Sequence, residues 1–227
     1  MKAPHSAHRL SHGLVLLYED KDIIAVDKPA GLLSIAAGTE REKTCYWILA
    51  EYLRHKGEKR RPAVVHRLDR DTSGVMIFAK SEQVKKKLME HWDEAVTERR
   101  YVALAEGALG DTEGIIDAPL GEDAGGRVIV QQGGKRAVTH WKLLKAGNGF
   151  SLLALELETG RRNQIRAHLH YIGHPVAGDK KYAARTDPVK RLCLHAEKIA
   201  FKHPKDGKPM EFVSPVPVAM SGAVKGK

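Results

Sequence analysis

The chain has 227 residues, of which 38 are Lys or Arg and 28 are Asp or Glu, so its formal net charge is +10. Apolar residues make up 42% and charged residues 29%, a balance that excludes wholesale disorder and indicates a globular protein. The positive excess favours a polyanionic partner, with nucleic acid ahead of a membrane surface.

The cysteine content and the hydropathy of the chain point to a cytoplasmic protein. Cys45 and Cys193 are too few for a disulfide framework, and they form no CxxC pair of the kind that binds zinc. No apolar run approaches the 18 residues that a membrane helix needs, and the first residues lack the apolar core of a signal peptide. We therefore expect a protein of a reducing compartment.

The first part of the chain predicts an arm, a hairpin and a helix. Residues 1–12 are polar, and we expect them to form a flexible N-terminal arm. Short apolar runs at 14–18 and 23–26, separated by charged residues, predict a β-hairpin. Thr44 is a typical helix cap, and apolar residues recur at helical spacing over 45–53, which predicts an amphipathic helix there.

The rest of the chain predicts more strands than helices. Residues 75–79 form an apolar run typical of a buried strand, and Ser81 is placed to cap a second helix. The remaining predicted elements, in chain order, are a strand at 101–105, short strands at most between 107 and 135, a strand pair at 137–144 and 150–157, a helix at 163–172 ended by Gly173, a last strand at 192–201 and a tail from Pro204.

The order of these elements indicates the fold class. Because the predicted strands and helices do not alternate as βαβ units, we expect an α+β fold with a mostly antiparallel sheet and flanking helices. We expect one domain over residues 13–217, followed by a flexible C-terminal tail over 218–227.

The densest cluster of reactive side chains is the segment HRLDRDTSG at 66–74. Apolar residues precede and follow it, so we expect a short loop held between buried strands, which can place a reactive group rigidly. Asp69 lies between Arg67 and Arg70, whose guanidinium groups favour its ionised form, and an ionised carboxylate can act as a covalent nucleophile. A structural turn, in which the polar side chains bond their own backbone, is an equally good interpretation of this segment alone.

The second cluster is ETGRRNQIRAHLH at 158–170. On a helix, Arg162, Arg166 and His170 form one stripe, and Arg166 is a candidate to bind a phosphate or a carboxylate. The alternative is an ordinary solvated basic face. His168, His170 and His174 also raise the possibility of a metal, but no HExxH or CxxC pattern supports one, and we expect no metal site.

Five ordered segments together resemble the RluA-type pseudouridine synthase family. The segment at 66–74 resembles the family signature, and DKPAGL at 27–32 resembles its upstream "KPxG" motif. The segments ETGRRNQIRAHL at 158–169 and GHPVAGD at 173–179 resemble its downstream motif. Two lesser blocks, RYVAL at 100–104 and LCLHA at 192–196, match in the right order. The resemblance runs from about residue 14 to residue 217.

The resemblance implies the pseudouridine synthase fold, with a central active-site cleft, and isomerisation of a specific uridine in ribosomal or transfer RNA. It implies that Asp69 is the catalytic nucleophile, that Tyr101 packs against the flipped-out base, and that Arg166 pairs with the catalytic carboxylate. Arg67 is placed to fill the space that the flipped base leaves. The family uses no metal or other cofactor. The partner would be a structured RNA, such as a ribosomal or transfer RNA stem-loop, and we expect a monomer.

Two positions depart from the family pattern. Asn163 stands where the downstream motif usually has His, and Arg99 stands where Lys is usual. Many relatives carry an additional N-terminal RNA-binding domain, and we expect this chain to consist of the catalytic domain. The alternatives from other functional classes are a catalytically silent RNA-binding module and a nuclease, and a nuclease would need more clustered carboxylates than Asp69 and Asp71 provide.

Overall fold

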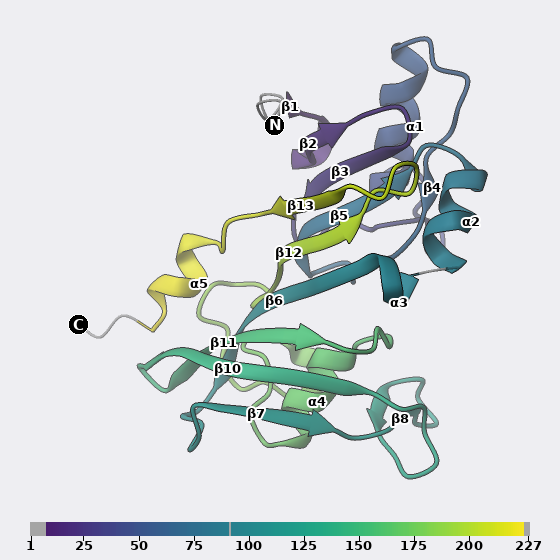
Figure 1. Ribbon diagram of the computed structural model, residues 1–227. Helices are drawn as coiled ribbons and strands as arrows, with labels where there is room; N and C mark the ends of the chain where they lie inside the picture. The colour runs from purple at the N-terminus through teal and green to yellow at the C-terminus, as the bar shows by residue number, and fades with distance from the viewer. Residues whose placement is uncertain (1–7, 91, 225–227) are drawn as a thin grey trace. The chain divides into compact units, whose positions relative to one another are not determined.

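The computed structural model describes residues 8–90 and 92–224, which divide into two compact units (Figure 1). Unit 1 comprises Met1–Arg99 and Ala196–Pro215, and unit 2 comprises Arg100–His195 and Val216–Lys227. Strands β6 (Val96–Glu106) and β12 (Leu194–Lys202) each continue from one unit into the other. The range predicted as one domain, 13–217, therefore contains two units, and the first seven residues of the predicted arm lie outside the described residues.

Unit 1 contains a largely antiparallel sheet in the order β1-β2-β3-β5-β12-β6. Strand β4 also pairs with β5, and β13 pairs with β12. The strands not yet defined are β1 (His8–Arg9), β2 (Val15–Glu19), β3 (Ile23–Lys28), β4 (Ala63–Val64), β5 (Ser73–Ala79) and β13 (Pro209–Val213). The β2–β3 pair confirms the hairpin predicted from the two short apolar runs.

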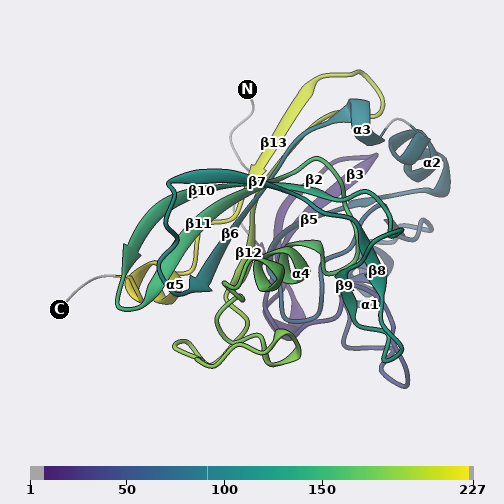
Figure 2. The ribbon, with the colours of Figure 1, turned by 90° about the horizontal axis from the view of Figure 1, so that it is seen from below.

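Helices cover both faces of this sheet (Figure 2). Helices α2 (Glu82–Glu90) and α3 (Trp92–Ala95) pack through Leu88 and Trp92 onto one face, which includes Ile23 and Ile77. Helix α1 (Cys45–His55) lies on the opposite face. Burial on both faces explains why the sequence of β5 is continuously apolar after its first residues instead of alternating with polar residues.

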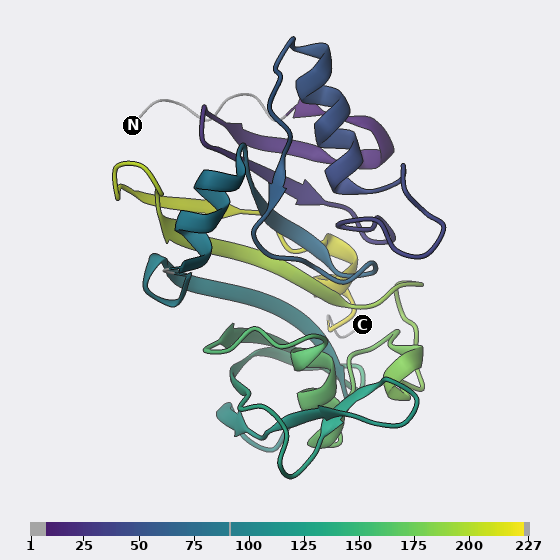
Figure 3. The ribbon, with the colours of Figure 1, turned by 90° about the vertical axis from the view of Figure 1, so that its right-hand side faces the viewer.

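The predicted helix caps are present at the starts of α1 and α2, whose ribbons Figure 3 shows from the side. Thr44 Oγ1 accepts a hydrogen bond of 3.1 Å from the backbone N–H of Trp47, which starts α1. Ser81 Oγ accepts one of 3.2 Å from Val84 N–H ahead of α2. Each hydroxyl satisfies a backbone donor that the first turn of a helix leaves without a partner.

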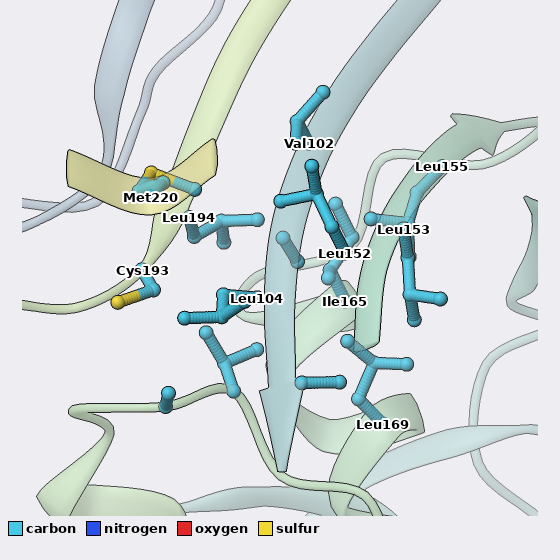
Figure 4. Packing of buried hydrophobic residues seen from close by; sticks show 14 of the residues in the cluster. Val102, Leu104, Leu152, Leu153, Leu155, Ile165, Leu169, Cys193, Leu194 and Met220 are labelled. Carbon is cyan, nitrogen blue, oxygen red and sulfur yellow. The ribbon is translucent and has the colours of Figure 1, made fainter. Parts of the chain in front are cut away.

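Unit 2 contains an antiparallel sheet in the order β6-β11-β10-β7, with strands β7 (Glu113–Asp117), β10 (Val138–Gly147) and β11 (Phe150–Leu157). Helix α4 (Gln164–Tyr171) packs through Ile165 and Leu169 onto the buried residues of β6 and β11 (Figure 4). A separate hairpin of β8 (Leu120–Glu122) and β9 (Val128–Val130) lies beside α4. The strand pair and the helix predicted here are confirmed, as is the α+β class.

The end of the described chain differs from the predicted tail. Instead of a loose segment from Pro204, the structure has strand β13, whose Phe212 ring lies 6.0 Å from that of Phe201. Instead of a flexible tail from residue 218, it has helix α5 (Val218–Gly222) with Met220 fully buried. The prolines and glycines of this segment favoured the prediction of a tail over that of a strand and a helix that pack through Phe212 and Met220. Residues 225–227 lie outside the described residues. No helix among the described residues is long and apolar enough to cross a bilayer.

Candidate active site

Asp69 lies in the loop between β4 and β5, as the sequence predicts. Burial alternates along this loop, since Arg67 and Arg70 are exposed, Leu68 is buried and Asp69 is half-buried. The buried Leu68 side chain attaches the loop to the core of unit 1, while the two arginine side chains reach solvent. The loop therefore carries the Asp69 carboxylate between two arginines at the surface of unit 1.

The buried hydroxyl of Ser34 holds the residue immediately before Asp69. Ser34 Oγ donates to the carbonyl of Leu68 at 2.7 Å and accepts from Leu68 N–H at 3.2 Å. Ser34 is 4% exposed, so both backbone groups of Leu68 have their partner in a place where water would not readily replace it. One side chain thus fixes both polar groups of this peptide segment.

Lys28 holds the residue immediately after Asp69. Its ammonium group donates to three backbone carbonyls, those of Leu32 at 2.7 Å, Arg70 at 2.9 Å and Pro29 at 3.0 Å. The Lys28 side chain is fully buried. Because an ammonium group has three donors, these carbonyls use its capacity and join the turn after β3 to the Asp69 loop.

Two further contacts close this part of unit 1. Gly31 N–H donates to the carbonyl of Arg70 at 2.9 Å, and Arg70 Nε donates to the carbonyl of Gly31 at 3.2 Å. Thr72 N–H donates to the carbonyl of Asp69 at 3.2 Å, which closes a tight turn. The loop therefore contains a tight turn that begins at Asp69 and is closed by backbone groups.

His66 is a structural residue in this arrangement. Its Nε2 accepts a hydrogen bond of 3.0 Å from Ile77 N–H in β5, and its ring lies 5.4 Å from that of Trp92. Burial lowers the pKa of His66 to about 4, and the charge of Arg99 adds to the shift. The imidazole is therefore neutral at physiological pH, as an acceptor of a backbone N–H must be.

In unit 2, Arg166 projects from α4 onto Asp179. Arg166 Nε and Nη2 donate to the two carboxylate oxygens of Asp179 at 2.6 and 2.8 Å. The guanidinium carbon lies 5.1 Å from the centre of the Tyr182 ring. A two-point contact and an aromatic face fix the plane of the guanidinium group, which a lysine could not reproduce. Arg166 is therefore not part of a simple solvated face, whereas Arg162, predicted on the same helical stripe, precedes α4 and is exposed.

Two of the three candidate metal-binding histidines, His168 and His174, have hydrogen-bond partners in unit 2. His168 is buried, with Nδ1 2.9 Å from Thr139 Oγ1 and Nε2 3.0 Å from the carbonyl of Ala118. Since that carbonyl can only accept, Nε2 carries the proton, and burial lowers the pKa of His168. His174 Nδ1 lies 2.8 Å from the carbonyl of Glu106. Both nitrogens of His168 are thus engaged in hydrogen bonds.

A different cluster has metal-ligating side chains, and the sequence did not reveal it because one member, His203, lies 183 residues after Asp20 along the chain. Asp20, Asp22 and His203 bring one ligand atom each within 4.8 Å of one another. Asp20 is already engaged, because it accepts from two backbone N–H groups at 2.7 and 2.8 Å, from Tyr18 and from His203 Nε2 at 3.1 Å. These hydrogen bonds link two turns of unit 1 through Asp20 and His203, whereas the buried Oδ2 of Asp22 has no hydrogen-bond partner among the described residues.

The predicted site residues divide between the two units. Arg67 and Asp69 share one loop of unit 1, whereas Tyr101 and Arg166 belong to unit 2. Tyr101 lies in β6 opposite Leu155 of β11 and packs, half-buried, against the apolar core of unit 2. The sequence motifs included Lys28 and Asp179, but their roles as a buried donor to three carbonyls and as the partner of Arg166 emerge from the structure.

Comparison with known proteins identifies the family. A model of the RNA pseudouridylate synthase family matches residues 22–171. The chain belongs to this family. An uncharacterised RNA pseudouridine synthase of Bacillus subtilis is 37% identical over 218 residues, which cover 93% of this chain and 72% of the relative. Ribosomal large subunit pseudouridine synthase D of Nitrosomonas europaea is 35% identical over 224 residues, which cover 93% of this chain and 64% of that protein.

Solved structures share the fold. Human RNA pseudouridylate synthase domain containing 4 matches with a TM-score of 0.74 and 23% identity, over 92% of both chains. Human RNA pseudouridylate synthase domain containing 1 matches with a TM-score of 0.71 and 25% identity, over 94% of this chain and 86% of the other. The protein is therefore an RNA pseudouridine synthase, an isomerase, which confirms the predicted family, fold and class of enzyme and argues against a nuclease.

Proposed function

We propose that the enzyme isomerises a specific uridine in ribosomal or transfer RNA, with Asp69 as its nucleophile. The Asp69 carboxylate attacks C1′ of the target nucleotide as the N1–C1′ bond breaks and uracil leaves with the electron pair. The base turns, C5 forms a bond to C1′ as the carboxylate leaves, and the proton lost from C5 is balanced by one gained at N1. No atom is gained or lost, and no co-reactant is consumed.

The observation that carries this proposal is the way the backbone on both sides of Asp69 is held. Ser34 binds both polar groups of Leu68, and Lys28 binds the carbonyl of Arg70. A nucleophile whose neighbours are fixed by buried side chains starts from a restricted geometry, and such restriction lowers the entropic part of a reaction barrier.

The other predicted residues have separate roles in the proposal. Arg67 is exposed on the same loop, so its guanidinium group is available to take the place of the flipped base in the RNA stack. Tyr101 would offer the face of its ring to the flipped uracil. Arg166, whose plane is fixed by Asp179 and Tyr182, would act through the direction of its charge on the catalytic carboxylate or the substrate.

The test of the nucleophile uses two carboxylates of one turn. Asp69→Asn should abolish conversion of uridine to pseudouridine while RNA binding is retained, because an amide cannot attack C1′. Loss of an essential nucleophile costs on the order of 10⁶ in rate in the best-studied protease case. Asp71→Asn, which removes an exposed carboxylate two residues away, is the matched control and should keep the rate within a few-fold. An Asp69→Asn enzyme that retains a tenth of the wild-type rate would exclude this role and favour a different nucleophile.

The target RNA is identified by mapping pseudouridines with and without the gene. Since a relative is named for the large ribosomal subunit, a ribosomal position is one candidate, and a transfer RNA position is the other. We also propose that the enzyme acts in the cytoplasm as a monomer, where both RNA classes are present. Sedimentation of the purified protein tests the monomer, and cell fractionation tests the compartment.

A further inference from the structure

The segment between α4 and β12 contains a dense group of positive charges. We define residues 178–191 as the basic loop; in Figure 2 it belongs to the light-green segment beyond α4. It contains five cationic side chains and two acidic ones, so its formal charge is 5 − 2 = +3. The four fully exposed cationic residues are Lys180, Lys181, Arg185 and Lys190.

The carboxylate of Glu106, in β6, fixes the middle of this loop. It accepts from Arg185 N–H at 3.1 Å, from Thr186 N–H at 2.6 Å and from the hydroxyl of Thr186. Gly178 N–H donates to the carbonyl of Thr186 at 2.8 Å, which closes the loop on itself. The backbone beside Arg185 is therefore held by a side chain from the sheet.

The first part of the loop is fixed by burial. Tyr182 is fully buried, and its hydroxyl donates to the carbonyl of Val128 at 2.8 Å. Asp179 caps the short helix Lys180–Tyr182 while it also binds Arg166. Lys180 and Lys181 thus project from a turn whose next side chain lies in the core of unit 2.

The four exposed cations of the loop have no ion pair with any acidic residue of the described chain. Two other exposed arginines of unit 2 differ in this respect. Arg136 pairs with Glu158 at 2.9 Å, and Arg162 pairs with Glu122 at 3.0 Å. The basic loop therefore combines an ordered backbone with positive charge that the protein itself does not neutralise.

We propose that the basic loop binds phosphate groups of the substrate RNA. Exposed cations that lie on one ordered segment and lack an acidic partner attract a polyanion, and phosphate contacts release the counterions of the nucleic acid. Because the backbone is already ordered, little conformational entropy remains to be lost on binding. Phosphate contacts carry no sequence information, so the loop would supply affinity and not the choice of uridine. The proposal rests on the RNA substrate of the enzyme and is independent of the role of Asp69.

The test compares two triple substitutions that each remove three positive charges. The loop variant carries Lys180→Gln, Lys181→Gln and Arg185→Gln. The control carries Lys85→Gln, Lys86→Gln and Lys87→Gln in α2, where Lys85 and Lys86 pair with Glu82 and Glu90 at 3.2 and 3.7 Å. Binding of a labelled RNA hairpin of defined sequence is measured between about 50 and 200 mM salt, the range over which phosphate contacts weaken steeply.

For the loop variant, we expect the slope of log K against log salt to fall in magnitude by about 2 to 3, since each phosphate contact contributes about 0.7 to 0.9. The affinity of the loop variant at the lowest salt concentration should fall about tenfold or more. The salt slope of the control should change by less than the contribution of one phosphate contact. The single-turnover rate at saturating RNA should be unchanged in both. An unchanged slope in the loop variant, or an equal loss in the control, would overturn the proposal.

A single substitution guards against an unfolded loop variant. Lys181→Glu reverses one exposed charge and should weaken RNA binding more than Lys86→Glu, with both proteins melting at the wild-type temperature. Equal binding by these two variants contradicts the proposal. The measurements that decide the proposal are made on binding, so they keep their meaning even where Asp69→Asn turns out to be active.

Discussion

Gly74 stands at the end of the segment 66–74 that contains Asp69, where β5 passes the backbone of β12. Its φ is +115°, and a Cβ added there would lie 2.1 Å from the carbonyl oxygen of Ala196, 2.6 Å from its carbonyl carbon and 2.7 Å from its nitrogen. These are backbone atoms of the neighbouring strand, so no side chain can rotate away. We predict that Gly74→Ala destabilises the enzyme strongly.

Two costs add in this variant. A non-glycine residue in a sparsely populated backbone region costs of order 1–3 kcal/mol. Overpacking against a fixed neighbour costs about 1–3 kcal/mol more. The expected loss of about 2–6 kcal/mol is a large part of the 5–15 kcal/mol that is typical for the free energy of unfolding.

Gly31→Ala is the matched control because it isolates the backbone strain. Gly31 has a φ of +86°, and an added Cβ would meet no atom within 4 Å. Urea unfolding monitored by circular dichroism gives the loss of free energy for each variant. We expect about 1–3 kcal/mol for Gly31→Ala and a further loss for Gly74→Ala. Equal losses would show that the close approach of Ala196 is not the reason for glycine at position 74.

Two further predictions concern charged groups. Arg166→Lys should lower the single-turnover rate at saturating RNA more than it weakens binding, because lysine cannot make the two-point contact with Asp179. A raised Kd with an unchanged rate would mean that Arg166 contacts a phosphate instead. Burial opposes ionisation of Glu19, but hydrogen bonds from Lys56, Lys80 and Tyr52 lower its pKa to about 2. The ionised Glu19 therefore contributes its full stability above its unfolded pKa of about 4.5, and this contribution is lost as the pH falls towards 2. Glu19→Gln should therefore make the urea midpoint fall less steeply between pH 4.5 and 2. A wild-type dependence of the urea midpoint on pH in this variant would contradict the role given to Glu19.

Local signals predicted the elements of this fold well. The caps at Thr44 and Ser81 were readable because the hydroxyl that starts a helix acts within three residues of the chain. Strand β13 was not predicted, because Pro209 and the glycine-containing turn before it are typical of a loop. The strand is stabilised by pairing with β12 and by contacts of Phe212 with aromatic rings distant in the sequence. Long-range burial of this kind leaves no periodic pattern in a five-residue segment.

In the candidate site, too, short motifs indicated some residues, whereas contacts between distant segments could not be predicted. Short motifs that resemble those of the family were enough to propose Asp69 and Arg166 as site residues, and their roles stay predictions. The sequence did not predict that Lys28 binds three carbonyls. A lysine side chain is ordinarily solvated, and one of the three acceptors, Arg70, lies 42 residues away along the chain. The partner of Arg166, Asp179, lies 13 residues away, beyond the end of the helix, so helical spacing could not indicate it.

Ser34 offers a test of whether this supporting structure matters for the reaction. In Ser34→Ala, the N–H and carbonyl of Leu68 lose their partner, at a cost of about 1–3 kcal/mol per buried group left unsatisfied. Ser151 makes the same pair of contacts in unit 2, donating to Gly107 at 2.9 Å and accepting from Leu109 N–H at 3.3 Å. The two alanine variants should therefore lose similar stability in urea.

If Asp69 is the nucleophile, the rates of the two variants should differ, because Leu68 precedes Asp69 whereas Gly107 and Leu109 lie in unit 2. A displacement of about 1 Å at a reacting group can cost about 10² in rate. We therefore expect Ser34→Ala to lower the single-turnover rate at saturating RNA by about 10- to 100-fold with an unchanged Kd, and Ser151→Ala to stay near wild type. Measuring both well below their melting temperatures removes the contribution of unfolded protein. If the two variants react equally fast, Ser34 stabilises the fold without positioning Asp69, and the restricted geometry of the loop is not what the reaction depends on.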